Sequence, residues 1–195
     1  RRALCRVYSA RTYGGHYLPD WHPGEDYRQV SYARKASGGG VLLTSIHGYD
    51  YIRWLFGEPK EVFGYVEKVS ELTIDVEDIV LALCKTKKDV LILAYSDFLE
   101  RRKEHKIDII CERGNIHWDY DFNTVRVFNG INKRWREYRY RFETNDMYMS
   151  ELKYFFDCLQ AKRTCEGLGI DDGVETLKFA LMIKRSGEKK RIVRA

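Results

Sequence analysis

The pattern of apolar and polar residues beyond residue 60 predicts a series of short β-strands. The pattern alternates over Val62–Val69, whereas it is continuously apolar over Ile79–Cys84 and Val90–Tyr95, on either side of a charged turn at residues 87–89. Further strands are predicted at Leu4–Ser9, Lys106–Glu112, Ile116–Tyr120, Val125–Phe128 and Trp135–Phe142. Because the strands are short and closely spaced, with turn signals such as Asn129-Gly130, they favour a large, open and mostly antiparallel sheet.

Three other stretches have helical periodicity. Gly38-Gly39-Gly40 precedes a helix predicted to end near Phe56, where Gly57 supplies the C-cap and Pro59 prevents continuation. Its buried stripe is expected to comprise Leu42, Ile46, Tyr49 and Phe56. Two more helices are predicted, one from Asn145 or Asp146 and one from Asp171. Their core-facing residues are expected to be Met149, Leu152, Phe155, Phe156 and Leu159, and Val174, Leu177, Phe179 and Leu181. The fold class is therefore α+β, with helices packed on one face of the sheet.

The two continuously apolar strands predict that both faces of the sheet are covered. Helices on one face normally leave the other face to water, which produces alternation. Ile79–Cys84 and Val90–Tyr95 do not alternate, and too few helices are predicted to cover a second face. We therefore expect a homo-oligomer, a dimer formed through the β-sheet face. The alternative is that long loops of the same chain cover it.

Composition narrows the range of partners and compartments. The 195 residues and 44% hydrophobic content suit one domain, residues 1–195, with a sizeable core. A net charge of +5 is spread over scattered basic residues apart from residues 101–103 and 189–191, so we expect no nucleic-acid partner. No apolar run is long enough to span a membrane. The five cysteines are odd in number and contain no C-x-x-C pair, which favours a reducing, cytoplasmic setting.

Several well-known site motifs are absent from the sequence. No G-x-G-x-x-G follows a strand, and Gly38-Gly39-Gly40 follows polar residues instead. No P-loop, nucleophile elbow, H-E-x-x-H or zinc-type Cys/His spacing occurs. We therefore predict no cofactor-binding and no metal-binding residues in this chain. The chain also lacks an initiator Met and begins inside a predicted strand, from which we expect a fragment of a longer protein.

The stretch 38–59, GGGVLLTSIHGYDYIRWLFGEP, resembles a glycine-led helix of the glucose–fructose oxidoreductase / inositol dehydrogenase (Gfo/Idh/MocA) family. Stretches 17–28, 74–78 and 114–118 are similar to further segments of the same family, in the same order. The resemblance implies that this is the C-terminal, dihydrodipicolinate-reductase-like domain, a substrate-binding and oligomerisation domain. It also implies a missing N-terminal Rossmann domain that binds NAD(P).

The resemblance implies hydride transfer between NAD(P) and a secondary alcohol or ketone carbon of a sugar or nucleotide-sugar. This fragment alone is expected to be inactive. One subgroup of the family has Asp-x-x-His-x-x-Asp, and Thr44, His47 and Asp50 occupy those positions. His47 suits the base, since an imidazole titrates near neutral pH. Asp50 would orient His47 or make a structural contact. Thr44 departs from the pattern, because it cannot act as a base near neutral pH.

An aromatic loop with two prolines and three glycines spans residues 13–24 and supplies candidate substrate contacts. With the residues that follow it, these candidates are Tyr17, Trp21, His22, Tyr27 and Arg28. Aromatic faces stack on sugar rings, and Arg28 can pair with a carboxylate or phosphate. The alternative is a purely structural loop.

Two other functions remain open at the level of sequence. The first is a non-catalytic dimerisation or ligand-binding domain in which Thr44 marks lost chemistry. The second is a basic, aromatic sheet that binds single-stranded nucleic acid.

Overall fold

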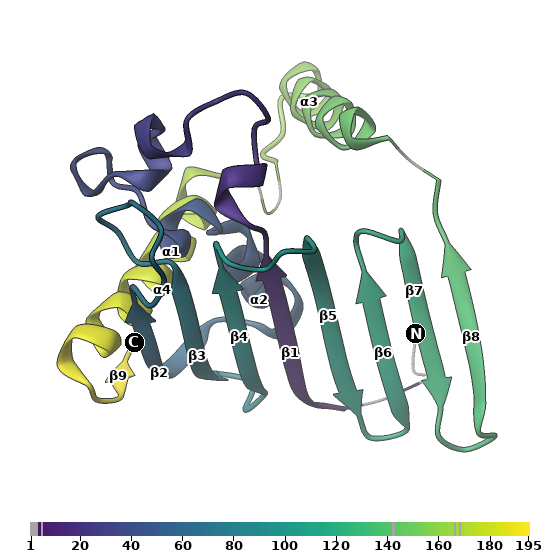
Figure 1. Ribbon diagram of the computed structural model, residues 1–195. Coiled ribbons are helices and arrows are strands. Elements are labelled where there is room, and N and C mark those ends of the chain that lie inside the picture. The colour runs from purple at the N-terminus through teal and green to yellow at the C-terminus, as the bar shows by residue number, and fades with distance from the viewer. Residues whose placement is uncertain (1–3, 5, 142, 166, 168) are drawn as a thin grey trace.

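The computed structural model describes residues 4, 6–141, 143–165, 167 and 169–195. Within these residues the chain forms one nine-stranded sheet in the order β8-β7-β6-β5-β1-β4-β3-β2-β9 (Figure 1). The strands are β1 Val7–Gly15, β2 Pro59–Glu67, β3 Ile79–Thr86, β4 Leu91–Asp97, β5 Glu104–Cys111, β6 Gly114–Asp119, β7 Thr124–Asn129, β8 Arg134–Arg139 and β9 Val193–Arg194. Neighbouring strands are antiparallel except β1 and β4, which are parallel. The predicted open, mostly antiparallel sheet is confirmed.

Three helices pack against one face of the sheet, as expected. They are α1 Val41–Thr44, α2 His47–Phe56 and α4 Ile170–Lys189, and Figure 1 shows them behind the half formed by β1 to β4. Four 3-10 turns lead into α1, at Leu18–Asp20, Tyr27–Gln29, Ser31–Ala33 and Lys35–Ser37. The fourth helix, α3 Thr144–Gln160, stands away from the sheet beyond the edge where β1 ends (Figure 1).

The hydrophobic core lies between the sheet and these helices. Alternate residues of β3, among them Val80, Ala82 and Cys84, are at most 3% exposed and face the helices. From α2, Tyr49, Ile52 and Phe56 fill the opposite side, and Leu42 of α1 joins them. The predicted stripe of this helical stretch is therefore confirmed, with Ile46 only partly buried against the core.

Most element boundaries lie within about three residues of the sequence prediction, and two elements differ from it more strongly. The first strand runs to Gly15 rather than ending at Ser9, because main-chain pairing with β4 and β5 continues through the two glycines. The single helix predicted up to Phe56 is two helices, interrupted at Ser45 and Ile46. At Ser45 the backbone ψ is 26°, outside the α-helical range, and the chain changes direction there.

The predicted core face of α3 is wrong, and that of α4 is confirmed only at Phe179, which is fully buried. Met149, Leu152, Phe155, Phe156 and Leu159 of α3 are 47–58% exposed. In α4, Val174, Leu177 and Leu181 are exposed, whereas Thr176, Phe179, Ala180 and Ile183 are buried. Both helices carry more apolar residues than this chain covers, so their sequence pattern did not identify the inward face.

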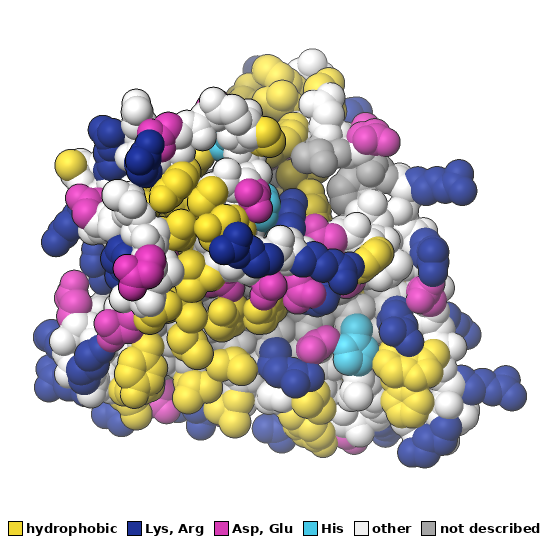
Figure 2. All heavy atoms as spheres, in the orientation of Figure 1, with side chains coloured by type: hydrophobic (Ala, Val, Ile, Leu, Met, Phe, Trp, Pro, Cys, Tyr) yellow, Lys and Arg dark blue, Asp and Glu magenta, His cyan; other side chains and the backbone are white. Residues whose placement is uncertain are grey.

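The sheet face opposite the helices is open and apolar over its centre. Leu81 and Leu83 of β3 and Leu91 and Leu93 of β4 are 39–58% exposed, and Tyr65 of β2 lies beside Leu81. Figure 2, which views this face, shows hydrophobic side chains gathered over the side of the sheet formed by β2, β3 and β4. The expectation that helices of this chain leave the second face uncovered is thus confirmed. No long loop of the described chain covers this patch (Figure 1).

Candidate functional site

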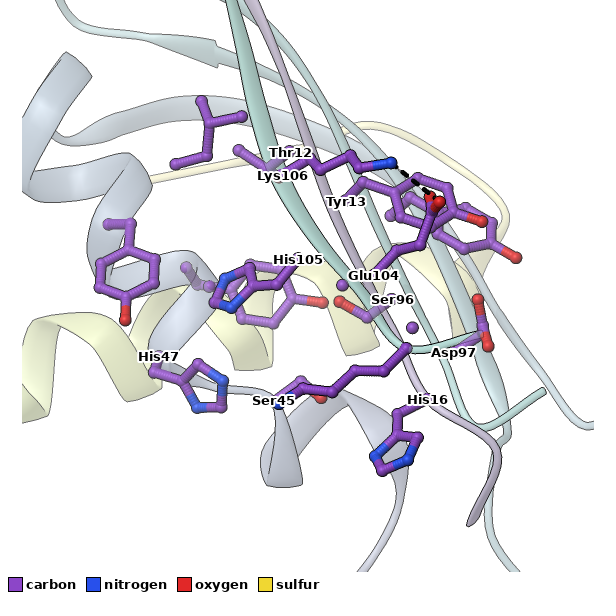
Figure 3. Close-up of a pocket in the computed structure, with 18 of the residues that line it drawn as sticks. Thr12, Tyr13, His16, Ser45, His47, Ser96, Asp97, Glu104, His105 and Lys106 are labelled. Atoms are coloured by element: carbon purple, nitrogen blue, oxygen red, sulfur yellow. Dashed lines mark hydrogen bonds and ion pairs between the residues drawn. The ribbon is translucent and has the colours of Figure 1, made fainter. Parts of the chain in front are cut away.

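A pocket of about 220 Å³ lies where the ends of three strands meet the turn between α1 and α2 (Figure 3). β1 ends there at Gly14-Gly15, β4 ends at Ser96-Asp97, and β5 begins at Glu104-His105. Gly14 pairs with Ser96 on one side and with His105 on the other. Because two neighbouring parallel strands end at this edge, their terminal side chains converge on the helix that covers them.

His47 and His105 stand together in this pocket. The ring centroids lie 6.0 Å apart at 60°. Tyr51 lies 6.2 Å from His47 and stacks on His105 at 5.7 Å. The surrounding protein atoms lower the pKa of His47, although its ring remains exposed at the mouth of the pocket. Burial, and then the neighbouring His47 and Lys103, lower the pKa of His105 to about 4. Both imidazoles are therefore neutral at pH 7.

A second wall is formed by His16 and Trp21. Their rings stack at 5.7 Å, and the Trp21 indole N–H donates to the His16 carbonyl at 3.0 Å. Trp21 also contacts Tyr32 and, edge to face, Phe98 of the core. The indole is thus held rigidly, and burial, followed by the Lys103 charge, lowers the pKa of His16.

The remaining lining is rich in hydroxyl groups. It includes Thr12, Tyr13, Ser45, Tyr49, Tyr51, Tyr95 and Ser96. Burial, and then the Asp97 carboxylate, raise the pKa of Tyr95 to about 12. Burial also raises the pKa of Tyr13, whose hydroxyl donates to Glu100 Oε2 at 2.8 Å. Of the lining acids, Glu104 pairs with Lys106, and Asp97 accepts from two main-chain N–H groups through Oδ1, while its buried Oδ2 has no hydrogen-bond partner among the described residues. Beside the charged side chains of Lys103 and Lys106, the pocket therefore offers many neutral donors and acceptors, which suit a polyhydroxylated ligand.

The two other predicted catalytic residues lie outside the pocket lining. Asp50 accepts a hydrogen bond from Thr176 Oγ1 of α4 at 2.7 Å and lies 3.5 Å from Arg53. No hydrogen bond joins Asp50 to the His47 ring among the described residues. Thr44 is half-buried at the end of α1. Of the proposed Thr44, His47 and Asp50 set, the structure brings only His47 to the cavity.

Of the five predicted substrate contacts, Trp21 alone lines the pocket. Tyr17 packs on the core, with the Arg101 guanidinium 3.6 Å above its ring. Tyr27 also packs on the core, and its hydroxyl accepts from the Thr73 N–H. His22 is exposed near Tyr32. Arg28 is already paired through two nitrogens with Asp26, which lowers the pKa of that carboxyl to about 2.

Sequence reasoning missed the residues supplied by β5 and by the end of β1. His16 and His105 are far apart in the chain, and no local spacing connects them. The only sequence signal was the pair of glycines at 14 and 15, which end a strand beside an aromatic loop. What brings these residues together is the register that pairs Gly14 with His105.

The glycine turn before α1 does not fit the pyrophosphate of a dinucleotide. Main-chain Leu42 N–H donates to Glu77 Oε1 at 3.2 Å, and Val41 N–H donates to the Glu77 carbonyl. A Cβ built on Gly40 would lie 2.1 Å from Glu77 Oε1. The chain's own carboxylate therefore occupies the space where a phosphate would approach.

Neither a metal-binding cluster nor a membrane-spanning helix occurs among the described residues. No cluster of three or more His, Cys, Asp or Glu side chains there is arranged to hold a metal ion. None of the helices described is long and apolar enough to cross a membrane.

Comparison with solved structures shows this fold in oxidoreductases. Levoglucosan dehydrogenase in complex with NADH matches with a TM-score of 0.87 at 16% identity, over 98% of this chain and 59% of that one. Aldose-aldose oxidoreductase from Caulobacter crescentus, complexed with glycerol, gives 0.83 at 19% identity, over 99% and 57%. UDP-N-acetylglucosamine 3-dehydrogenase from Acidithiobacillus ferrooxidans gives 0.73 at 17% identity, over 94% and 54%.

This chain thus spans less than two thirds of each of these structures. A search of curated proteins gave no match. The model of the GFO/IDH/MocA C-terminal domain matches residues 2–117, which is more than half of the sequence. The chain therefore belongs to the GFO/IDH/MocA family, as a C-terminal domain.

Proposed function

We propose that this chain is the substrate-side half of an NAD(P)-dependent oxidoreductase acting on a sugar or nucleotide-sugar. The observation that carries the proposal is the pocket in which neutral His47 faces a lining of hydroxyl groups. The structural neighbours of this chain include a dehydrogenase in complex with NADH, an aldose-aldose oxidoreductase and a nucleotide-sugar dehydrogenase. Their substrates share secondary alcohols.

In the proposed reaction His47 takes the proton of a secondary hydroxyl. An imidazole held neutral can accept a proton at pH 7 and return it in the reverse direction. Trp21 offers a rigid aromatic face to the apolar side of a sugar ring. NAD(P), when bound, accepts or donates the hydride. Because the glycine turn of this chain does not fit a dinucleotide, we assign NAD(P) binding to a domain outside this chain.

The position of α3 supports a further domain above the pocket. This helix carries the exposed apolar residues Met149, Leu152 and Phe156, and Figure 1 shows it beyond the edge of the sheet where β1 and β4 end, the strand ends that line the pocket. An amphipathic helix with an uncovered apolar face needs a partner to bury it. We propose that an N-terminal dinucleotide-binding domain covers α3 and completes the site, so that this chain alone has no turnover.

Oligomerisation through the open sheet face is part of the same proposal. The patch formed by Tyr65, Leu81, Leu83, Leu91 and Leu93 is contiguous across three strands. Apolar patches of this kind mark association surfaces, and a two-fold dimer buries one patch against its copy. Free thiols at Cys84, Cys111, Cys158 and Cys165 support a reducing, cytoplasmic setting.

His47→Ala in the full-length protein tests the proposed function. We expect kcat to fall by about 10²–10⁴-fold, the usual range for a lost general base, with the Kd for NAD(P) unchanged. The matched control is His117→Ala, because His117 lies on the open face of the sheet, where it pairs with Asp108. Wild-type turnover in His47→Ala would remove His47 from the mechanism. A full-length protein without activity on any sugar would instead favour a non-catalytic ligand-binding or dimerisation domain.

A further inference from the structure

His105 is held rigidly at the inner end of the pocket. Its ring stacks on Tyr51 and lies 5.0 Å from Trp118 and 5.4 Å from Tyr120. Its main-chain N–H donates to Asp121 Oδ2 at 2.9 Å, and its carbonyl accepts from Tyr120 N–H. Aromatic rings and backbone thus fix its position, as preorganised binding groups require.

The imidazole nitrogens of His105 make no hydrogen bond within the described part of the chain, although the ring is half-buried and lines the cavity. A polar group removed from bulk water normally has a hydrogen-bond partner. Figure 3 shows the His105 ring beside the same space as the His47 ring, so the unused donor and acceptor nitrogens of His105 are open to a ligand there.

The separation of the two rings suits one shared ligand group. An oxygen that makes two N···O hydrogen bonds of about 2.9 Å at a bent angle holds the two nitrogens about 4.7 Å apart. Because each nitrogen lies on the rim of its ring, imidazoles whose centroids are 6.0 Å apart can meet this separation. We infer that His105 is a second substrate-contacting residue, which hydrogen-bonds the oxygen that His47 deprotonates or the hydroxyl next to it. This inference rests on the proposed function and adds a residue to it.

The neutral state of His105 suits this role. A neutral imidazole has one donor and one acceptor, so it can bind the alcohol and the carbonyl product alike. Because the aromatic surroundings keep His105 uncharged, it does not repel the imidazolium that forms when His47 takes a proton. A second charged histidine at this distance would oppose that step.

Two variants of the full-length protein separate contact from packing. His105→Phe keeps an aromatic ring for Tyr51 and Trp118 but has no polar atom. His105→Gln keeps a neutral donor and acceptor. We expect His105→Phe to lower kcat/KM by about tenfold or more, the effect of leaving a substrate oxygen unpaired, and His105→Gln to recover most of it. His117→Gln, on the opposite face of the sheet, is the matched control.

The assay uses NAD⁺ and NADP⁺ with a panel of D-glucose, levoglucosan, myo-inositol and UDP-N-acetylglucosamine. A kcat/KM of His105→Phe equal to that of the wild type, while His47→Ala is inactive, overturns the inference alone. A wild-type protein inactive on every member of the panel counts against both the proposed function and the inference. A greater loss in His105→Gln than in His105→Phe also overturns the inference, because packing would then be the deciding property.

Discussion

Thr176 of α4 donates a hydrogen bond to the carboxylate of Asp50 on α2, with 2.7 Å between the oxygens. The same threonine accepts from Arg53 Nη1 at 2.7 Å, and Arg53 is bound through two further nitrogens to Glu58. Arg53 is only 9% exposed, so its charge depends on these partners. The network joins the helix that begins with His47 to the long C-terminal helix, and it gives Asp50 a structural contact.

Removing the Thr176 hydroxyl is expected to destabilise the fold. Thr176→Val keeps the shape of the side chain but leaves Asp50 and Arg53 each without one partner. We expect the free energy of unfolding to fall by about 1–2 kcal/mol, because the buried Arg53 guanidinium loses one of its partners, whereas the Asp50 side chain is 49% exposed and can bond water instead. Urea denaturation followed by far-UV circular dichroism measures it. Thr73→Val is the control, because Thr73 is exposed and its change should stay within about 0.5 kcal/mol.

Gly40 is expected to tolerate no side chain. Its φ is +112°, and a Cβ would overlap the Glu77 carboxylate that caps α1. Gly40→Ala should therefore cost about 2 kcal/mol or more through strain and displacement of Glu77. Gly173→Ala in α4 meets nothing within 4 Å and should stabilise the helix by up to about 1 kcal/mol. Equal melting temperatures for the two variants would contradict this account of Gly40.

The open sheet face predicts a dimer that one charge can dissociate. Leu83 is 58% exposed and lies directly opposite Leu93 on the neighbouring strand. Leu83→Glu should weaken association by at least about tenfold, because a carboxylate would lose its water at the centre of an apolar interface. Sedimentation velocity at several concentrations measures the shift.

The control for the dimer is Ile131→Glu, in the turn between β7 and β8, where the side chain is already 71% exposed. It should sediment as the wild type does. A wild-type protein that remains monomeric at micromolar concentration would show that the patch has another role.

The stability of the protein is expected to depend on the charge state of His105. Its pKa in the folded state, about 4, lies below the ordinary histidine value near 6.5, so the unfolded chain binds a proton more readily. Stability is therefore complete above pH 6.5 and falls as the pH drops from 6.5 towards 4. The slope from this residue approaches about 1.4 kcal/mol per pH unit.

Urea denaturation of wild-type protein and of His105→Gln at pH 7, 6 and 5 isolates that contribution. His47 and His16 also have lowered pKa values and remain in both proteins, so only the difference between the two slopes reports on His105. Parallel slopes would mean that His105 is protonated equally easily in the folded and unfolded states.

The sheet could be predicted from sequence because its signals are local. The alternation in β2 and the apolar runs in β3 and β4 each involve only a few consecutive residues. The end of α2 is likewise marked by a single neighbouring residue, Gly57. The interruption at Ser45 could not be predicted, because the apolar spacing from Leu42 to Tyr49 continues across it.

The inward faces of α3 and α4 depend on what surrounds them. In α4, Val174, Leu177 and Leu181 have the spacing of a buried stripe, and so do Thr176, Phe179, Ala180 and Ile183. Only packing against β2 decides between the two. In α3 the apolar residues are exposed, because no described part of this chain covers them.

Only those residues of the candidate site that belong to a local sequence motif could be predicted. His47 was identified by the glycine-led helix, and Trp21 by its aromatic loop. His105 was not, since its relation to His47 exists only after β5 pairs with β1. Asp50 looked catalytic from its spacing, and the contact with Thr176 could not be inferred from residues that far away in the chain.

The central position of β1 constrains the order in which the molecule can assemble. Ser9 pairs with Leu91 on one side and Ile110 on the other, so β1, which precedes both partner strands in the sequence, can pair with them only after they are synthesised. Pairings between such distant segments form slowly. The hairpin of β3 and β4 can form early on its own, but the pocket walls at Gly14 and His105 come together only when β1 inserts between β4 and β5. Folding of the sheet and formation of the binding site are therefore expected to end in the same step.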